Sequence, residues 1–262
     1  MKTILITGAT DGLGRALAAD LAATGARLLV HGRDEARGRE TVDAIRAESG
    51  NDNLELYIAD LSELAQVRRL AEEVAGAGAL DVLVSNAGIG TTVPGGGARQ
   101  ESSDGIELRF AVNYLAGYLL TRSLLGNLTE SARIVHVSSA GQTPIDFEDP
   151  MLERDYSGVR AYCQSKLAQI MFTFDLAEEL AGTGVTANAL HPATYMPTKI
   201  VPSPVSTLEE GVAATRRLVD DAELDGVTGR YFNGRREARA DAQAYDPDAR
   251  RRLRELSDAL IA

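Results

Sequence analysis

The sequence of 262 residues contains a single cysteine, no tryptophan, and no apolar run long enough to cross a bilayer. The lone Cys163 excludes a disulfide within the chain and is typical of a protein kept in a reducing compartment. The start, Met1-Lys2-Thr3, leads directly into a strand-like run and lacks the apolar core and cleavage site of a signal peptide. We therefore expect a cytoplasmic protein without a membrane span.

Positive charge and histidine are also scarce. Lys and Arg number 27 against 38 Asp and Glu, which gives a formal net charge of −11. This balance argues against a nucleic-acid partner. The three histidines have no cysteine or carboxylate at ligand spacing, so we expect no metal site. We interpret His136 and His191 as hydrogen-bonded structural residues.

The chain does contain a regular alternation of short apolar runs with longer amphipathic ones, and 44% of its residues are hydrophobic. The runs typical of strands buried on both faces are 3–7, 27–31, 54–58, 81–85, 133–137 and 185–190. The segments typical of helices are 13–24, 36–48, 62–75, 106–125 and 160–181, and a strand at 229–232 and a charged helix at 248–261 follow. This order predicts one α/β domain over residues 1–262, with right-handed crossovers and a parallel sheet.

Three irregular stretches interrupt this alternation. They cover residues 90–105, 141–159 and 196–207, and they follow the fourth, fifth and sixth predicted strands. They should therefore gather at the carboxyl ends of the strands, which is where open α/β sheets bind ligands.

A glycine-rich turn, Thr7-Gly8-Ala9-Thr10-Asp11-Gly12-Leu13-Gly14, joins the first predicted strand to the first helix. Its glycines permit a tight turn and a close approach to a pyrophosphate, and the helix start adds N–H donors. Three residues separate the first two glycines, whereas the common dinucleotide motif has one. The position at the first β–α junction is nevertheless the context that nucleotide binding requires.

The residues after the second and third strands bear on which nucleotide binds. A carboxylate at the end of the second strand would hold a ribose 2′-hydroxyl, but Gly32 occupies that place and Arg33 follows. Arg33 can pair with a 2′-phosphate, which favours NADP(H) over NAD(H), although Asp11 and Asp34 oppose a phosphate and Arg33 could be an ordinary surface residue. Asp60 could accept a hydrogen bond from an adenine amino group or cap the helix that follows.

Tyr162 and Lys166 lie four residues apart in a predicted helix, so their side chains share one face. A nearby ammonium favours ionisation of a phenol and lowers its pKa from about 10. A tyrosine tuned in this way can exchange a proton with a carbonyl or alcohol oxygen near neutral pH. Alone, the spacing is weak support, because a half-buried tyrosine beside a solvated lysine occurs in many helices.

Six motifs in the same order give the chain a resemblance to the short-chain dehydrogenases/reductases over almost its whole length. They are Thr7 to Gly14 for T-G-x-x-x-G-x-G, Asp60-Leu61, Ser85-Asn86-Ala87-Gly88 for N-N-A-G with serine in first place, Asn113, Ser139, and Tyr162 to Lys166 for Y-x-x-x-K. Residues 160–186 and 229–245 most resemble bacterial members related to the retinol-dehydrogenase type. The resemblance implies a single Rossmann-type, doubly wound domain with a seven-stranded parallel sheet, helices on both faces, and assembly as a homodimer or homotetramer.

The resemblance also implies catalytic roles. Tyr162 would be the general acid in reduction and the base in oxidation, and Lys166 would lower its pKa and hold the nicotinamide ribose hydroxyls. Ser139 would donate a hydrogen bond to the substrate oxygen, with the adjacent Ser138 as the alternative. Asn113 would position a water that links the lysine to solvent, or would be an ordinary helix asparagine that makes a backbone bond.

The cofactor-binding residues implied by the resemblance come from the same motifs. They are Gly8, Thr10, Gly12, Leu13, Gly14, Arg33, Asp60, Leu61, Asn86, Ala87, Gly88, Tyr162, Lys166, Pro192 and Thr194. After the sixth strand the sequence departs from the family, because Ala193 replaces a glycine and Pro197 stands where a threonine is expected. Either Thr194 or Thr198 would then contact the nicotinamide.

The span from Ser139 to Tyr162 is longer than the usual spacing in the family. The insertion carries apolar residues among acidic ones, namely Ile145, Phe147, Met151, Leu152 and Tyr156. We expect it to flank the substrate mouth; the alternative is a surface excursion without ligand contact.

These features favour an NADP(H)-dependent oxidoreductase that reduces a ketone or aldehyde, or oxidises the corresponding alcohol. The expected cleft walls are neutral and partly apolar, which suits an uncharged, medium-sized carbonyl substrate; they are Thr91, Thr92, Val93, Tyr195, Met196 and Ile200. One alternative is an NAD(H)-dependent alcohol dehydrogenase, against which Gly32 and Arg33 argue. Another is a non-catalytic dinucleotide-sensing scaffold, which is disfavoured because the chain keeps all four polar residues of the expected site.

Overall fold

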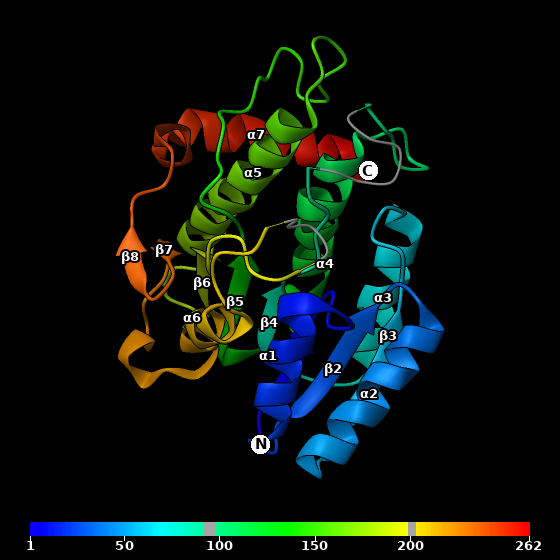
Figure 1. The fold of residues 1–262 in the computed structure, drawn as a ribbon. Helices are drawn as coiled ribbons and strands as arrows, with labels where there is room; N and C mark the ends of the chain where they lie inside the picture. The colour runs from blue at the N-terminus through cyan, green and yellow to red at the C-terminus, as the bar shows by residue number, and fades with distance from the viewer. Residues whose placement is uncertain (92–97, 199–202) are drawn as a thin grey trace.

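The computed structural model describes residues 1–91, 98–198 and 203–262, and its framework is an eight-stranded sheet in the order β3-β2-β1-β4-β5-β6-β7-β8 (Figure 1). The strands are β1 Thr3–Ile6, β2 Arg27–Gly32, β3 Leu54–Ile58, β4 Leu80–Ser85, β5 Leu128–Val137, β6 Thr186–His191, β7 Arg230–Asn233 and β8 Arg236–Ala238. The first seven pair in parallel, which confirms the predicted Rossmann-type sheet. The short β8 is an unpredicted addition that pairs antiparallel to β7 through a turn at Gly234, whose φ is +59°.

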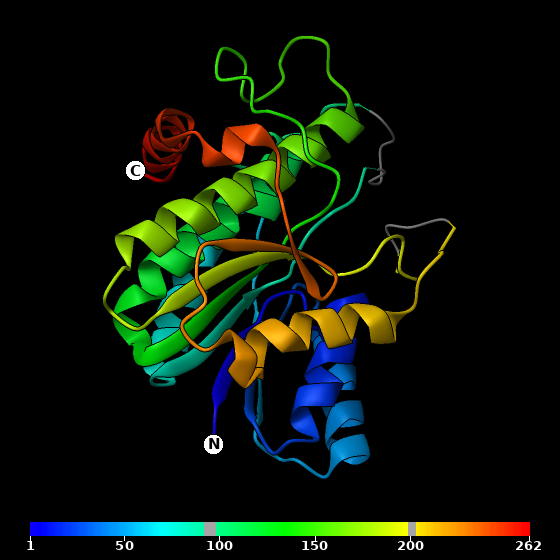
Figure 2. The same cartoon turned by 90° about the vertical axis from the view of Figure 1, so that its left-hand side faces the viewer.

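Helices cover both faces of the sheet (Figure 2). They are α1 Gly12–Ala22, α2 Glu35–Ser49, α3 Leu64–Gly76, α4 Ala116–Leu124, α5 Gly158–Glu179, α6 Leu208–Asp220 and α7 Pro247–Ile261. One apolar cluster joins the sheet to α1, α2 and α6, and a larger one joins the opposite face to α3, α4 and α5. The strands are thus buried on both sides, as their continuous apolar runs predict.

Two helical segments differ from the sequence prediction. The segment Phe110–Leu115 is a π-helix, η1, that leads into α4, whereas an uninterrupted α-helix was expected over residues 106–125. Helix α6 was not predicted, although its start carries a recognisable capping box in which Thr207 and Glu210 bond each other's backbone N–H.

The terminal helix α7 packs outside α5 and against α4. Arg254 pairs with Asp175 of α5 at 2.8 Å, and the Tyr118 hydroxyl of α4 donates to Asp258 at 2.6 Å. The charged face of α7 therefore covers part of α4 and α5. In the part of the chain that the structure describes, no helix is both long and apolar enough to span a membrane.

Strands β1 and β4 are neighbours at the point where the order of the sheet reverses direction. In open α/β sheets a ligand binds outside the carboxyl ends of the strands at such a point. The glycine-rich turn follows β1, and the three irregular stretches follow β4, β5 and β6, as predicted. The insertion after β5 forms the green loops at the top of Figure 1.

We expect the substitution Thr207→Ala to lower the free energy of unfolding by about 1 kcal/mol, because it removes the side chain that accepts the Glu210 N–H at 3.2 Å. Urea denaturation checks the value, and Thr207→Ser is the matched control that keeps the acceptor. Equal losses in the two variants would contradict the capping role.

Candidate functional site

The glycine-rich turn is joined to the end of β4 by a cluster of short hydrogen bonds. The Asn86 side chain donates to the carbonyl oxygens of Thr7 at 2.8 Å and Gly8 at 3.2 Å, and the Thr7 hydroxyl accepts the N–H groups of Asn86 and Ala87. A Cβ on Gly14 would lie 2.3 Å from the Gly8 oxygen, and one on Gly8 would lie 2.8 Å from the Ala87 Cα. Only glycine allows this approach, which leaves a backbone cradle at the start of α1.

His31 holds the same turn from the side of β2. Its Nδ1 accepts the Gly8 N–H at 3.1 Å, so its Nε2 carries the proton and donates to the carbonyl oxygen of Ala59 at 3.1 Å. Its own carbonyl accepts the Ala9 N–H at 2.8 Å. Burial lowers the pKa of His31 to about 4, which keeps the ring neutral and able to accept. The role of His31 was not predicted, because a histidine at a strand end carries no spacing signal.

The residues expected beside the adenosine lie together at the ends of β2 and β3. A Cβ on Gly32 would lie 2.4 Å from the Thr10 Cγ2, so the strand end touches the glycine-rich turn. The Arg33 guanidinium lies 3.8 Å from the Asp60 carboxylate, and its side chain is 75% exposed. The other oxygen of Asp60 accepts the N–H and hydroxyl of Ser62 at 2.9 and 2.7 Å. This carboxylate therefore caps the turn before α3 and not, as the alternative interpretation expected, the helix itself, because the N-cap of α3 is Glu63.

Leu13 and Leu61, also on the list of implied cofactor contacts, are both buried. Leu13 belongs to the apolar cluster of α1, α2 and α6, and Leu61 to the opposite cluster. Their side chains therefore pack into the core on either side of the sheet.

Tyr162 and Ser139 meet at the end of β5. The Ser139 hydroxyl lies beside the Tyr162 hydroxyl, close enough to lower its pKa, and accepts the Gly141 N–H at 3.1 Å. The carbonyl oxygen of Ser139 accepts the Tyr231 hydroxyl at 3.0 Å, which fixes the segment. The Ser138 hydroxyl points elsewhere and donates to the Lys166 carbonyl oxygen at 2.7 Å. Of the two adjacent serines, Ser139 therefore faces the tyrosine.

Lys166 lies one helical turn after Tyr162 on α5, with its nitrogen 5.8 Å from the centre of the tyrosine ring. The ammonium donates to the carbonyl oxygen of Val137 and to the Gln169 side chain, both at 2.9 Å. Burial lowers the pKa of Lys166 to about 7. Gln169 was not predicted as part of the site, and its i+3 position on the helix was the available signal.

The lowered pKa expected for Tyr162 is not what this structure gives. Burial raises the pKa of the phenol above its ordinary value, and the hydrogen bond with Ser139 opposes that rise. The expectation considered only the nearby charge of Lys166. Loss of water around the partly buried phenol is the largest cause of the rise.

Asn113 lies in the π-helix η1, and its side chain is fully engaged. Its oxygen accepts the Ile89 N–H at 2.7 Å, and its nitrogen donates to the Ile89 oxygen at 3.1 Å and to Ser165 at 2.9 Å. Both backbone groups of Ile89 are thus held, as the ordinary interpretation of this asparagine predicted. A Cβ on Gly88 would lie 3.2 Å from the Asn113 oxygen and 3.5 Å from the Lys166 nitrogen. Asn113, Gly88 and Lys166 are therefore neighbours, as the water-positioning role requires.

The segment after β6 separates the two candidate threonines. The Thr194 hydroxyl lies 3.0 Å from the His191 Nε2, next to Pro192, and its carbonyl oxygen accepts the Ser206 hydroxyl at 2.6 Å. Thr198 lies against the glycine-rich turn, where its Cγ2 would be 3.1 Å from a Cβ on Gly12. The two threonines thus face different parts of the site. The expected wall residues Thr92, Val93 and Ile200 lie outside the described residues.

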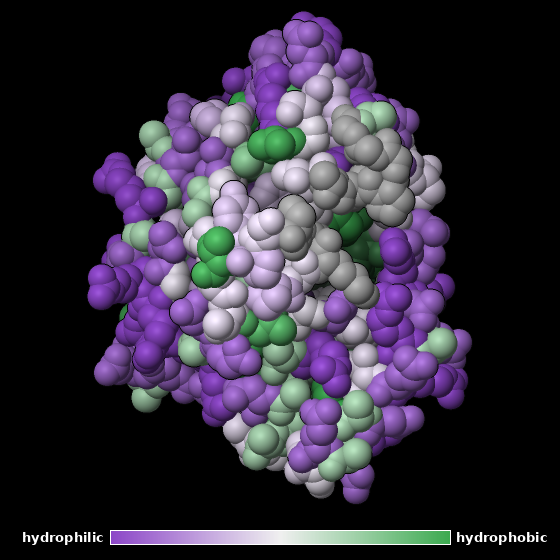
Figure 3. Space-filling view, in the orientation of Figure 1, coloured by the Kyte–Doolittle hydropathy of each residue, from purple (hydrophilic) through white to green (hydrophobic). Residues whose placement is uncertain are grey.

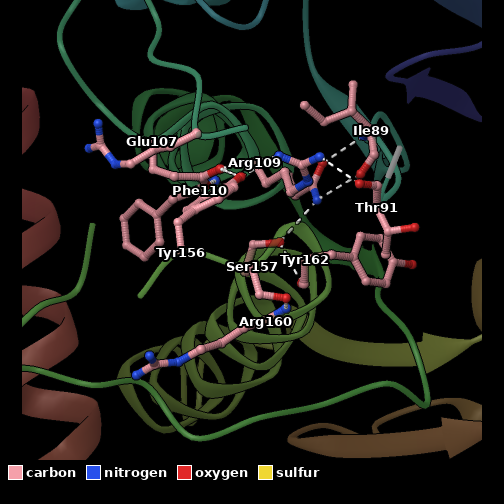
Figure 4. A network of polar contacts seen from close by, with 12 residues as sticks. Ile89, Thr91, Glu107, Arg109, Phe110, Tyr156, Ser157, Arg160 and Tyr162 are labelled. Carbon is pink, nitrogen blue, oxygen red and sulfur yellow. Dashed lines mark hydrogen bonds and ion pairs between the residues drawn. The ribbon is translucent and has the colours of Figure 1, made fainter. Parts of the chain in front are cut away.

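The apolar residues of the insertion anchor it to the core. Ile145 and Leu152 are 4% and 1% exposed, and Phe147 and Met151 pack against the larger apolar cluster. The Gln243 side chain bonds both backbone groups of Ile145, at 2.6 and 3.1 Å. The insertion is therefore tied to the end of the chain. Its fifth apolar residue, Tyr156, points toward the segment before η1 (Figure 4).

The face seen in Figure 3 has a hydrophilic margin and paler residues of intermediate hydropathy in its middle. Across the described residues, no group of three or more His, Cys, Asp or Glu side chains is arranged to hold a metal ion. His136 bonds Thr173 at 2.8 Å and His191 bonds Thr194, so both make the hydrogen bonds expected of structural histidines. The arrangement supplies a phenol, a serine hydroxyl and a buried amine next to a backbone cradle.

Comparisons with known proteins agree with this geometry. The sequence pattern of the short chain dehydrogenases matches residues 2–207. Human retinol dehydrogenase 14 is 36% identical over 99% of this chain and 86% of its own length. Human retinol dehydrogenase 13 is 33% identical over 99% of this chain and 84% of its own. The expected likeness to the retinol-dehydrogenase type is confirmed.

Solved structures give the same result. An uncharacterized protein from Mycobacterium paratuberculosis is 30% identical with a TM-score of 0.82, and the match covers 100% of this chain and 93% of that one. A short chain dehydrogenase from Burkholderia cenocepacia J2315 in complex with NADP is 27% identical with a TM-score of 0.72, and the match covers 88% and 95% of the two chains.

The buried His31 predicts a loss of stability in acid. Its folded-state pKa of about 4 lies below the unfolded value of 6.5, so the unfolded chain binds more protons between these pH values. The free energy of unfolding should therefore fall as the pH falls through this window, by on the order of 3 kcal/mol from this residue. The variant His31→Gln keeps a hydrogen-bond acceptor but does not titrate. The free energy of unfolding, measured with urea at several pH values, should therefore fall less steeply with decreasing pH in this variant.

The control for His31→Gln is His136→Gln. Burial also lowers the pKa of His136 to about 4, but this residue lies away from the glycine-rich turn. In both variants the free energy of unfolding should depend less steeply on pH, and only His31→Gln should weaken binding of the NAD(P) cofactor. A slope unchanged by His31→Gln would contradict the assignment.

Proposed function

The chain belongs to the short-chain dehydrogenase/reductase family, and we propose that it is an NADP(H)-dependent oxidoreductase that reduces a ketone or aldehyde, or oxidises the corresponding alcohol. The observation that carries the proposal is the placement of the Ser139 hydroxyl beside the Tyr162 hydroxyl, with Lys166 buried four residues further along the helix of Tyr162. These groups lie at the carboxyl end of β5. The glycine-rich turn, which follows β1, lies at the same edge of the parallel sheet.

The residues of the cradle fit a dinucleotide. Gly8 and Gly14 let the glycine-rich turn pack closely against Ala87 and Asn86, where a Cβ would clash, and the start of α1 presents N–H groups of the kind that bind pyrophosphate. Thr198 closes over Gly12 from the other side. When bound, the nicotinamide supplies the hydride, and the protein supplies positioning and electrostatics.

The residues around Tyr162 have distinct roles in the proposed reaction. In reduction the Tyr162 hydroxyl gives its proton to the carbonyl oxygen, and the Ser139 hydroxyl donates a hydrogen bond to the same oxygen. The raised pKa of Tyr162 keeps the phenol protonated at neutral pH, which is the form that reduction requires. Lys166 has a pKa of about 7, so it can return a proton to the tyrosine near neutral pH. Asn113 holds Ile89 and adjoins the Lys166 amine.

The preference for NADP(H) rests on Arg33. Among the described residues its exposed guanidinium is paired with Asp60 alone, at 3.8 Å, which leaves it able to pair with a 2′-phosphate. The Burkholderia cenocepacia structure named above, which is described as a complex with NADP, supports the same choice. The retinol dehydrogenase relatives favour an uncharged, largely apolar aldehyde or ketone as substrate.

The substitution Tyr162→Phe should reduce turnover of an aldehyde with NADPH by at least about 10²-fold, because it removes the proton donor. NADPH affinity, measured by fluorescence titration, should stay within about twofold of the wild type, since the ring remains in place. Surviving turnover would show that another group supplies the proton.

The substitution Arg33→Ala should lower the preference for NADPH over NADH by about tenfold or more, the usual worth of a charge-assisted hydrogen bond. The measurement is kcat/KM for each cofactor. Arg39→Ala is the matched control, because Arg39 is also exposed on this side but pairs with Glu35 of its own helix. If the preference survives in Arg33→Ala, another group must recognise the cofactor.

A further inference from the structure

Arg109 is a fully buried charged residue that the proposed reaction does not use. It has 0% exposure, and its guanidinium donates to the carbonyl oxygens of Gly90 at 2.9 Å and Thr91 at 2.7 Å. It also donates to the Tyr156 hydroxyl at 2.5 Å and lies 3.5 Å from the Glu107 carboxylate (Figure 4). One side chain therefore bonds three segments that are far apart in the sequence: the segment after β4, the start of η1, and the insertion.

Glu107 completes this cluster. Its carboxylate accepts the Tyr156 hydroxyl at 2.9 Å through one oxygen and the Phe110 N–H at 2.7 Å through the other. Glu107 is 1% exposed, so the ion pair with Arg109 is shielded from water. Burying two charges is costly unless their hydrogen bonds are satisfied, and here several protein groups satisfy both.

The cluster lies beside the helix face that carries Tyr162. A Cβ on Gly158, at the start of α5, would lie 2.8 Å from the Thr91 oxygen and 3.2 Å from the Arg109 Nη2. Gly158 and Tyr162 are four residues apart, so they share one face of α5. The Thr91 backbone is therefore pressed against the helix one turn before the tyrosine.

A second side chain holds the same wall. Asn113 bonds both backbone groups of Ile89, and Arg109 bonds the carbonyl oxygens of the next two residues, Gly90 and Thr91. Both side chains reach this segment from the same helical stretch. Residues 89–91 thus have their backbone carbonyls turned toward the buried side chains of Arg109 and Asn113.

We propose that Arg109, held by Glu107 and Tyr156, is a positioning residue that fixes residues 89–91 and the insertion as one rigid wall of the carbonyl-substrate site next to Tyr162. The inference rests on the proposed function, because the site it shapes is that of the proposed reaction. The wall would contact parts of the substrate away from the reacting carbonyl. Such contacts act equally on the bound substrate and the transition state, so their loss raises KM and leaves kcat nearly unchanged.

The test uses Tyr156→Phe, which removes one hydroxyl and leaves the buried ion pair intact. Initial rates with NADPH would be measured for benzaldehyde and for the larger all-trans-retinaldehyde. We expect the KM for retinaldehyde to rise at least fivefold, with kcat and the KM for NADPH within twofold of the wild type. The double variant Glu107→Gln/Arg109→Met, which removes both charges together, should show the same pattern with a larger rise.

The matched control is Tyr57→Phe. Tyr57 also has a partly buried hydroxyl that donates to a glutamate, Glu55 at 3.1 Å, and burial raises its pKa to about 12, as it does for Tyr156. This control lies on β3, away from the wall, and should leave every constant unchanged.

Two results would overturn the positioning role. One is an unchanged KM for both aldehydes in Tyr156→Phe. The other is a parallel loss in kcat, both KM values and thermal stability, which is what a purely structural role produces. A wild-type protein that reduces neither aldehyde with NADPH would instead contradict the proposed function, and the positioning role would be lost with it.

Discussion

The hydrogen bonds between Asn86 and the glycine-rich turn join the two halves of the sheet at the place where the strand order reverses. The approach is possible because Gly8 and Gly14 have no Cβ, and His31 fixes the turn from the opposite side. A larger side chain at Gly14 would push α1 away from β4. The positions of the other site residues depend on these hydrogen bonds, since they set the distance between the glycine-rich turn and the ends of β4 and β5.

Burial decides the charge state of the reacting groups. Lys166 is held by the Val137 carbonyl and Gln169 in the interior, so its pKa falls, while the pKa of Tyr162 rises for the same physical reason. In both cases burial favours the neutral form of the side chain. The site thus holds a protonated phenol beside an amine that titrates near neutral pH, and the π-helix brings Asn113 next to that amine. Proton donation in the proposed reduction follows from this pairing.

The insertion after β5 is anchored to the rest of the protein by buried contacts on two sides. Ile145 and Leu152 are buried, and Gln243 ties the insertion to the chain end. On the other side, Tyr156 reaches the ion pair of Arg109 and Glu107. The insertion, the segment after β4 and the start of η1 are thus connected by buried polar contacts. That connection is the basis for treating them as a single wall beside Tyr162.

The sequence by itself determined the alternation of strands and helices, because buried parallel strands need continuous apolar runs and crossover helices need amphipathic ones. It also determined the glycine-rich turn and the spacing of Tyr162 and Lys166, since both are local patterns. These local patterns identified the family, and the comparisons confirmed it. The start of α6 carried a local capping signal that was overlooked.

Only the tertiary structure decided the direction of the Tyr162 pKa, the bond from His31 to Gly8, and the partners of Arg109. Each depends on groups that lie far apart in the sequence and meet only after folding. The amino-acid sequence shows which side chains can carry a charge but not which of them are buried. Burial controls both the pKa of an ionisable group and the free-energy cost of leaving it without a hydrogen-bond partner.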